Sequence, residues 1–584
     1  MYNIKNKWRG FFRKEDGAAM VIAAFSLVAF LSIVSLVTDM GLKYHQKSKL
    51  QSAMDAAALA AVRYMPDKTT AEKVALEYVE KNGFSANGVT VEFPTEEIVR
   101  VSDTVEGKTV FASLFNVDSV IIKAKAAARY VDKNMGIDFD YLMFHGDDSQ
   151  FNLNGHYNVG GSIFGNGNVH ADGGGSTVTG TIFSANNATF NSYSVTVNHT
   201  ESHVRNQSMP DFDEMIMSVA PEANEGMFVR TYTPISKSAF YLNRYSAGSV
   251  INSSVSINGN TYCAGSLSTS YHSDVLIIYG DLYVEGDFTP QCPVYVKGNA
   301  YIGGNLTTTW DKSLRVGGDL YVNGNTTLNG NANISGNFFY TGGNLTRGSY
   351  YSLQCDCETY VGENITLNAT TAFNGPVYCM GVFDKQGSVM MSVNGNIYAH
   401  DVLKLQSGGT TVNGDIYVWG NSASSLDTVA DISGPFTLNG DLYNRKGELL
   451  LSGQGAYNIK GVLYSGGSIS TNQGSSGITL SGCMIAEDDI SIGGSTHTYN
   501  EAGATLSIYS RKGDITLYSQ QGGFDLWGII YAPKGNVALA SGDFDIHGSI
   551  IGDTITCNPG GLSMTHNDRQ LPYSESIKTA VLVE

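Results

Sequence analysis

The sequence has 584 residues, a formal net charge of −18, an aromatic content of 11%, and 67 Gly against only 12 Pro. This length allows a large core and more than one domain, and the aromatic content argues against a chain that is disordered throughout. Residues 1–65 carry nine Lys or Arg against four Asp or Glu, which leaves −23 on the remainder and argues against nucleic acid as its partner.

Segment 1–17 is basic, and residues 18–38 that follow contain no charged side chain. At about 1.5 Å per residue, a helix of this length crosses a hydrocarbon core of about 30 Å. The basic segment predicts a cytoplasmic N-terminus, so everything after Asp39 is expected outside. The prediction is a single-pass protein of the cell membrane. The alternatives are a cleaved secretory signal and a buried soluble helix.

Residues 39–65 are expected to continue as a helix, because they are rich in Ala, Leu, Gln and Lys and are followed by Pro66. Small side chains on this helix allow close packing against a partner surface. The residues of this candidate docking face are Ala53, Ala57, Ala60 and Ala61. The alternative is that the face covers the small domain that follows in the sequence.

Three motifs mark this N-terminal part: Lys-Glu-Asp-Gly-Ala-Ala at 14–19, Asp-Met-Gly at 39–41, and the alanine-rich run at 50–61. Together they resemble the N-terminal module of Tad-type (TadE/TadG-like) Flp pilus assembly proteins. The resemblance implies membrane anchoring and partners among pilus assembly proteins or pilin-like subunits. It also implies a small α+β domain over 66–135, with a helix near 69–82 and strands near 89–93, 97–105 and 119–131.

Pilin-like members of that family are cleaved after a glycine and carry Glu at the fifth position of the mature chain. Gly17 and Ala18 are the corresponding candidate processing site, but Ile22 stands where that Glu would be. The chain also shows no sign of the von Willebrand-type adhesion domain of the larger members.

A short unit, Gly-x-aliphatic-aromatic, recurs along the rest of the chain at intervals of about 20 residues. Its copies start at Gly161, Gly180, Gly280, Gly298, Gly318, Gly375, Gly395, Gly414, Gly440, Gly461 and Gly528. A period of this size, with alternating strands between Gly and Asn corners, predicts a parallel β-helix over 136–565. The aliphatic and aromatic positions are expected to stack into its core, and glycine is expected to supply positive φ at corners. A propeller is the alternative, but its blades need about 40 residues.

Two segments of this region break the pattern. Residues 200–250 are predicted to form a partly helical insertion that projects from the coil, with a short helix opened by Pro210 and Asp211. Residues 566–584 are predicted to cap the last turn, because a cap protects strand edges that would otherwise pair with other chains.

Seven cysteines are scattered without a CxxC motif, and Cys355 and Cys357 are too close in sequence for good disulfide geometry. We therefore expect buried free thiols, with a disulfide scaffold as the alternative. The 11 histidines show no metal-ligand spacing, so the sequence nominates no metal and no cofactor.

The β-helix region resembles PilX-like pilus-associated surface proteins, and single turns resemble bactofilin solenoids. The predicted function is therefore structural or adhesive, with surface polysaccharide as a candidate partner, and no catalytic residue is nominated. The alternative is a membrane-tethered carbohydrate-active enzyme, which a groove of converging carboxylates and basic residues would favour. The acidic residues considered for it are Asp138, Asp140, Asp147, Asp148, Glu487, Asp488 and Asp489, for which turn or surface roles are the preferred interpretation.

Overall fold

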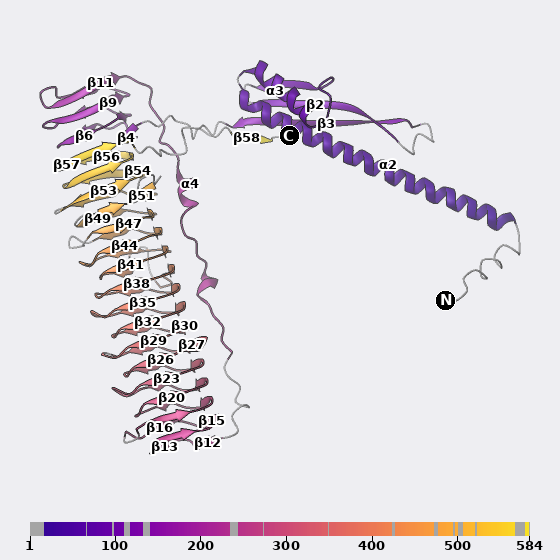
Figure 1. Cartoon of the computed structure of the whole chain (residues 1–584). Helices are drawn as coiled ribbons and strands as arrows, with labels where there is room; N and C mark the ends of the chain where they lie inside the picture. Colours follow the sequence, from indigo (N-terminus) through magenta and orange to yellow (C-terminus); the bar gives the residue numbers. More distant parts are fainter. Residues whose placement is uncertain are drawn as a thin grey trace. The chain divides into compact units, whose positions relative to one another are not determined.

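The computed structural model describes most of the chain and divides it into two compact units (Figure 1). One unit comprises residues 1–138 with 573–584, and the other comprises residues 139–572. The described residues are 17–65, 67–95, 98–109, 117–131, 141–233, 243–271, 274–348, 350–422, 427–471, 477–494, 497–499, 506–519, 522–566 and 579–582.

The first unit packs two helices on an antiparallel sheet. Helix α2 (Gly17–Ala61) is one continuous helix of 45 residues, followed by a short 3-10 turn (Val62–Tyr64) and by α3 (Lys68–Lys81). Asp67 caps α3 by accepting the backbone N–H groups of Thr69 and Thr70. The sheet contains β1 (Thr90–Thr95), β2 (Ile98–Lys108), β3 (Ser119–Val131) and β58 (Thr579–Leu582), in that order. The helix and three strands expected near 69–131 are therefore present.

The fourth strand of this sheet comes from the C-terminus. Strand β58 pairs antiparallel with β3, with Ala128 opposite Leu582 and Val131 opposite Thr579. Residues 566–584 were predicted to cap the last turn of the solenoid, and for β58 this prediction is wrong. Strand β58 instead hydrogen-bonds to β3 of the N-terminal sheet, whose residues lie more than 440 positions earlier in the sequence.

Helix α2 runs without interruption through the segment 18–38. Among the described residues, no helix is found to be sufficiently long and apolar to cross a membrane. The side chains at 18–23, 28–29, 31–33 and 35–37 lie outside the described residues.

The second unit is a parallel β-solenoid of about 20 turns, as the repeat predicts. From β12 to β53 (Gly523–Trp527) each turn contributes one strand to each of three faces. Four longer strands each run over two faces, namely β9 (Ser176–Ser184), β11 (Val195–Ser202), β54 (Ile529–Ala540) and β56 (Ile550–Asn558). The first face begins with β12 (Asn243–Tyr245), β15 (Thr261–Cys263) and β18 (Leu282–Val284); the second with β13 (Ser249–Ile251), β16 (Leu267–Thr269) and β19 (Phe288–Thr289); the third with β14 (Val255–Ile257), β17 (Leu276–Ile278) and β20 (Val294–Val296). Strands three positions apart in sequence pair in parallel, as β18 does with β21 (Ala300–Ile302).

The order of the turns in space differs from their order in sequence. Strand β4 (Tyr141–His145) stacks on β56 (Ile550–Asn558), and β6 (Tyr157–Val159) stacks on β57 (Gly561–Thr565). From there the chain builds the turns up to β11 (Val195–Ser202), and residues 203–233 run back along the stack; the next described strand is β12 (Figure 1). The earliest turns of the solenoid therefore rest on its latest ones.

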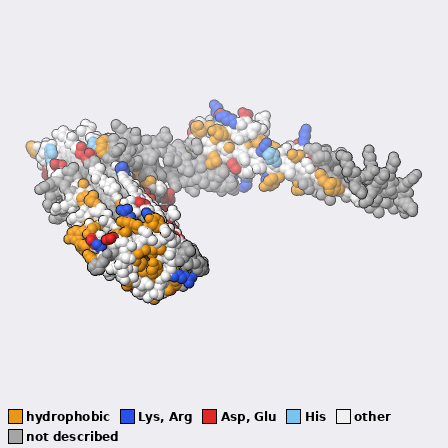
Figure 2. All heavy atoms as spheres, turned by 60° about the horizontal axis from the view of Figure 1, so that its bottom comes forward, with side chains coloured by type: hydrophobic (Ala, Val, Ile, Leu, Met, Phe, Trp, Pro, Cys, Tyr) orange, Lys and Arg blue, Asp and Glu red, His pale blue; other side chains and the backbone are white. Residues whose placement is uncertain are grey.

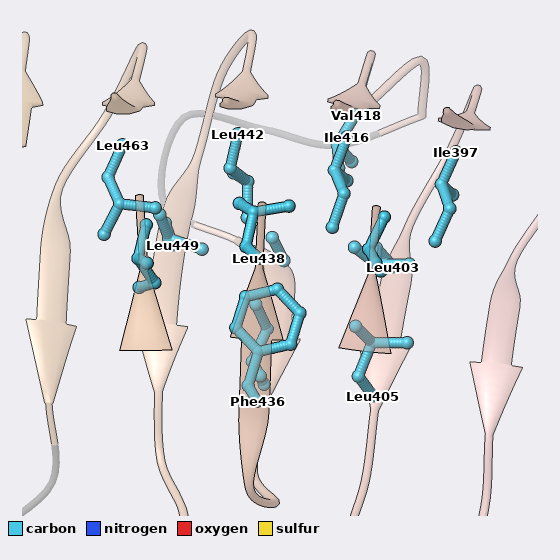
Figure 3. Packing of buried hydrophobic residues seen from close by; sticks show 14 of the residues in the cluster. Ile397, Leu403, Leu405, Ile416, Val418, Phe436, Leu438, Leu442, Leu449 and Leu463 are labelled. Atoms are coloured by element: carbon cyan, nitrogen blue, oxygen red, sulfur yellow. The ribbon is translucent and has the colours of Figure 1, made fainter. Parts of the chain in front are cut away.

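The core fills the inside of the stack. Alternation along each three-residue strand points its first and third side chains inward, where Leu, Ile, Val and Phe of successive turns pack on one another (Figure 3). Each such side chain contributes about 1.5–3 kcal/mol when fully buried. All seven cysteines are buried and free, which confirms the expectation of free thiols.

At Gly318, as at most copies of the repeat unit, the glycine serves close approach rather than positive φ, whereas Gly528 has φ of 113°. A Cβ atom on Gly318 would lie 2.3 Å from Asn299 Oδ1 and 2.9 Å from the carbonyl carbon of Gly298, both in the turn below. The next residue, Asp319, is held by the same corner, because its N–H donates to Asn299 Oδ1 at 2.8 Å. Glycine is needed here because successive turns touch through their backbones.

Candidate functional surfaces

The aromatic side chain of each repeat unit points out of the solenoid, not into its core. Leu320 and Val322 are buried inside, whereas Tyr321 between them stacks on Tyr301 below and Tyr340 above, with ring centroids 4.9 and 4.5 Å apart. The expectation that aromatic and aliphatic positions share one core is therefore wrong for the aromatic rings. They form a separate column on the first face, which we call the tyrosine ladder. Its stacked members include Tyr283, Tyr301, Tyr321, Tyr340, Tyr360, Tyr378, Tyr398, Tyr417, Tyr443 and Tyr464.

Residues 203–233, which we call the strap, lie along this ladder. The strap contains α4 (Asp213–Met217) and a 3-10 turn (Glu225–Phe228), and Figure 1 shows it following the stack. The predicted insertion therefore exists and is partly helical, but its described part packs on the solenoid instead of projecting from it. Tyr321 is only 9% exposed because Tyr232 of the strap stacks on it at 5.0 Å.

The upper part of the strap is fixed by hydrogen bonds. Asp213 accepts from Tyr509 Oη at 2.6 Å and from Arg511 Nη2 at 2.7 Å. Burial opposes ionisation of Asp213, but these two donors hold the pKa of its carboxyl below the ordinary value. Arg511 also donates to Glu487 at 2.9 Å, and Lys512 pairs with the same carboxylate at 2.7 Å.

The lower part of the strap is fixed mainly by rings. Phe228 is fully buried and contacts Tyr398, His400 and Trp419 at centroid distances of 5.6 to 5.9 Å. Arg230 lies 4.3 Å from the ring of Tyr378. A hollow of about 360 Å³ lies between the strap and the solenoid near Pro210, Asp213 and Arg511. Its polar side chains are the ones that hold the strap in place, so we assign it no further role.

The candidate docking face on α2 is occupied by the chain itself. Ala53, Ala57 and Ala61 are fully buried in a core formed with α3 and the sheet, and Ala60 is half-buried. A partner cannot reach the three buried methyl groups while this unit is folded. The alanine face therefore covers the small domain of its own chain, which was the alternative interpretation of the sequence. The candidate processing site Gly17–Ala18 forms the first turn of α2.

The acidic residues considered from sequence do not converge. Asp138 and Asp140 lie outside the described residues. Asp147 accepts the N–H of Ser149 in a turn, which lowers the pKa of its carboxyl, and Asp148 is exposed beside it. Glu487 belongs to the ion pairs with Arg511 and Lys512 at the strap, and Asp489 accepts the N–H of Asp514 at a corner of the solenoid.

A different set of carboxylates shares an open groove of about 510 Å³ on the third face. Asp525 of β53 (Gly523–Trp527) and Asp545 of β55 (Asp543–His547) are register partners on neighbouring turns, about 5 Å apart at Cα. Asp543 and His156 also line the groove. The Oδ1 atom of Asp525 is buried and has no hydrogen-bond partner in the described structure.

The alternation of inward and outward residues in β53 and β55 could have indicated this groove from the sequence. Asp525-Leu526-Trp527 and Asp543-Phe544-Asp545-Ile546-His547 alternate polar and apolar residues, which places Asp525, Asp545 and His547 on the outer face of adjacent strands. Across the part of the chain that the structure describes, no group of three or more His, Cys, Asp or Glu side chains is arranged to hold a metal ion.

Comparison with known proteins identifies the N-terminal module. Residues 17–63 match the family described as putative Flp pilus-assembly TadE/G-like. This match covers α2 and the turn after it, and the resemblance noted in the sequence is confirmed for this segment. No curated protein matches the chain, and no solved structure matches it.

Proposed function

We propose that this chain is a membrane-anchored, extracytoplasmic structural or adhesive protein associated with Tad/Flp-type pilus assembly. The observation that carries the proposal is the fusion of a TadE/G-like domain at 17–63 to a solenoid of about 20 turns. At about 4.8 Å per turn, such a solenoid is roughly 90–100 Å long. Its continuous core and stacked corners suit a stiff spacer that carries a surface away from the membrane.

Anchoring by residues 18–38 is supported by the absence of charge in this segment and by the basic residues before it. The described side chains of this part of α2 support it as well. Phe25, Leu27, Phe30 and Val34 are 44–71% exposed, which a helix in water would avoid and a helix in lipid would favour.

Alkaline carbonate extraction of membranes tests the anchor. We expect the full chain to stay in the membrane pellet and a Leu27→Arg, Phe30→Arg variant to be released, because each charge costs about 2.5–3.5 kcal/mol at the centre of a spanning helix. Tyr193→Arg is the matched control, since Tyr193 is fully exposed on the solenoid. Release of the unmodified chain by carbonate would refute anchoring.

Association with pilus assembly proteins requires a free surface on the TadE/G-like domain. The alanine face is buried, so we place this surface on another side of α2, where Met40 and Tyr44 lie one turn apart and are 66% and 77% exposed. Changing Met40 and Tyr44 to Ser should reduce co-purification of Tad-type components at least several-fold. The same change at exposed Tyr64 should not. Equal recovery with all variants would disprove this surface.

A carbohydrate-active enzyme is the second candidate, and only the acidic groove favours it. Asp525 and Asp545 are register partners on adjacent turns, so two carboxylates project side by side from the same face, as an acid/base pair on a glycoside would require. An enzyme of this kind was expected to have basic residues beside its carboxylates. The described residues that line this groove include no Lys or Arg. Release of reducing ends from a polysaccharide that disappears in Asp525→Asn and in Asp545→Asn would establish this function. We expect no such release.

A further inference from the structure

The loops between the second and third faces alternate in length from turn to turn. Longer loops span 270–275, 308–313, 348–352 and 386–390, and shorter ones span 290–293, 329–331 and 368–370. Because β16 pairs with β19, β19 with β22 (Leu306–Thr307), and so on to β34 (Phe383–Lys385), the longer loops lie two turns apart along one edge. The spacing along this edge is about 10 Å.

Three of these four longer loops carry an exposed aromatic ring, and the fourth, 386–390, carries none. Tyr271 is 62% exposed, Trp310 is 56% exposed and Tyr350 is 84% exposed. The rings are linked from one long loop to the next, because Lys312 Nζ lies 5.0 Å from the ring of Tyr271 and Trp310 lies 5.5 Å from Tyr350. We call this row the aromatic edge. Figure 2 turns the bottom of the Figure 1 view forward and shows hydrophobic side chains gathered at that end of the solenoid.

The backbone holds these rings outward at a cost. Tyr350 has φ of 77° and its neighbour in the row, Asp311, has φ of 64°. A bulky side chain in the left-handed region is disfavoured by about 1–2 kcal/mol. Such conformations are retained mostly where the exposed side chain has a use. Turn formation alone would be better served by glycine at residue 350.

We infer that the aromatic edge binds a linear polysaccharide, whose pyranose rings stack on Trp310, Tyr350 and Tyr271. The C–H face of a pyranose packs against an aromatic ring, and Lys312, Asp311 and the tyrosine hydroxyls can bond to sugar hydroxyls.

The surroundings of the rings favour a glycan over a protein partner. The shorter loops between the aromatic ones are polar, as Asn329-Gly330-Asn331 shows. A protein interface has a contiguous apolar centre. Exposed aromatic rings flanked by amide groups and by the charged side chains of Asp311 and Lys312 instead fit a polymer that presents apolar ring faces beside hydroxyl edges.

Binding is measured on the purified full-length chain in detergent, so its outcome does not depend on location or on pilus association. The probes are insoluble cellulose, chitin and purified peptidoglycan in pull-down assays, and cellohexaose and chitohexaose in titrations followed by tryptophan fluorescence. We expect retention on at least one polymer. A Trp310→Ala, Tyr350→Ala variant should bind at least ten-fold more weakly.

Two further variants separate binding from folding. Tyr193→Ala and Tyr279→Ala remove rings that are 100% and 54% exposed, and both should bind as the unmodified chain does. Tyr193 follows β10 (Ala188–Phe190) at the far end of the stack from Trp310, and Tyr279 follows β17 at a different corner of the solenoid. Tyr350→Gly should raise the melting temperature by relieving the positive φ while weakening binding. Lack of binding to all five probes would overturn the inference, and so would equal losses in the edge variant and the two control variants.

Discussion

His145 lies at the seam where the first strand of the solenoid stacks on one of its last. It is 1% exposed, its Nδ1 accepts the N–H of Ile555 at 3.0 Å, and its Nε2 lies 3.2 Å from Ser149 Oγ. These partners fit a neutral ring with its proton on Nε2. Burial lowers the pKa of His145 to about 4, and the nearby charge of Asp147 only partly opposes this.

The seam should therefore weaken in acid. Unfolded histidine titrates near pH 6.5, so between about pH 6.5 and 4 the unfolded chain binds the proton and the folded chain does not. The contribution of His145 is fully present above pH 6.5 and is lost as pH falls towards 4, by about 3 kcal/mol. Urea unfolding at pH 7 and pH 4 should show this loss relative to His145→Gln. Parallel pH profiles of the two proteins would contradict it.

Two buried cations inside the solenoid differ in how well they are satisfied. Arg347 is fully buried and donates through Nη1 to the carbonyl of Leu328, but its Nε and Nη2 have no partner in the described structure. Lys385, two turns away, donates to three carbonyls of residues 406–408 at 2.7 to 2.8 Å. Hydrogen bonds therefore replace the lost hydration of Lys385 well, but they replace that of Arg347 only in part.

Replacing each cation by methionine should therefore have opposite results. Arg347→Met is expected to leave the free energy of unfolding unchanged or to raise it by about 1–2 kcal/mol. Lys385→Met should lower it by about 1–3 kcal/mol, because three buried carbonyls lose their donor. Denaturant midpoints of the two variants, measured side by side, decide the matter. A loss of stability in both would show that Arg347 is satisfied by water.

At the scale of the elements, the strap is the part with the least repetitive sequence and the most specific contacts. Phe228, Arg230 and Tyr232 each dock on a different set of rings in the ladder. Hydrogen bonds between side-chain oxygens and the backbone of the next turn, such as Asp319 to Asn337 at 2.7 Å, hold the corners independently of the strap. The strap should therefore detach without unfolding the turns beneath it.

Phe228→Ala tests this separation. Removing a fully buried phenyl ring costs about 3–5 kcal/mol of stability. We expect the lower part of the strap to lose its attachment to the solenoid as a result. Limited proteolysis should cut within 203–233 many times faster, while circular dichroism keeps its β signal. Tyr193→Ala, at an exposed ring, should leave the rate unchanged. Collapse of the β signal in the Phe228 variant would mean that the ladder needs its cover.

In the whole molecule, two pairs of strands that are distant in sequence hydrogen-bond to each other, and we call each closed stretch of chain a circuit. The solenoid joins β4 to β56, and the N-terminal sheet joins β3 to β58, each across more than 400 residues. Contacts of such long sequence separation slow folding, because the loop must close before they form. The two circuits lie in different units, so each can be removed alone.

Truncation after Pro572 should affect the first unit only. It removes β58 and leaves the edge of β3 unpaired at residues 128–131. Hydrogen exchange of the β3 amides should become faster, while amides of the solenoid keep their protection. Val581→Pro should act in the same direction, because proline removes a donor from the strand. Exchange that accelerates in the solenoid as well would contradict the independence of the units.

The repeating parts of the fold could be predicted from the sequence. The period of about 20 residues and the inward aliphatic positions follow from local patterns, whereas helix α3 and strands β1 to β3 were implied by the resemblance to TadE/TadG-like proteins. These features are set by sterics and burial within one turn or one helix, so every repeat carries the information anew. Burial of the cysteines followed for the same reason.

The parts that depend on a single distant partner required the three-dimensional structure. The docking of the strap, the seam at His145, the pairing of β58 and the pairing of Asp525 with Asp545 leave no periodic trace. The outward tyrosines do follow from the pattern, because an aromatic residue beside a buried aliphatic one in the same strand points to the opposite face. Their burial does not, because the cover that shields the rings outside the core is the strap.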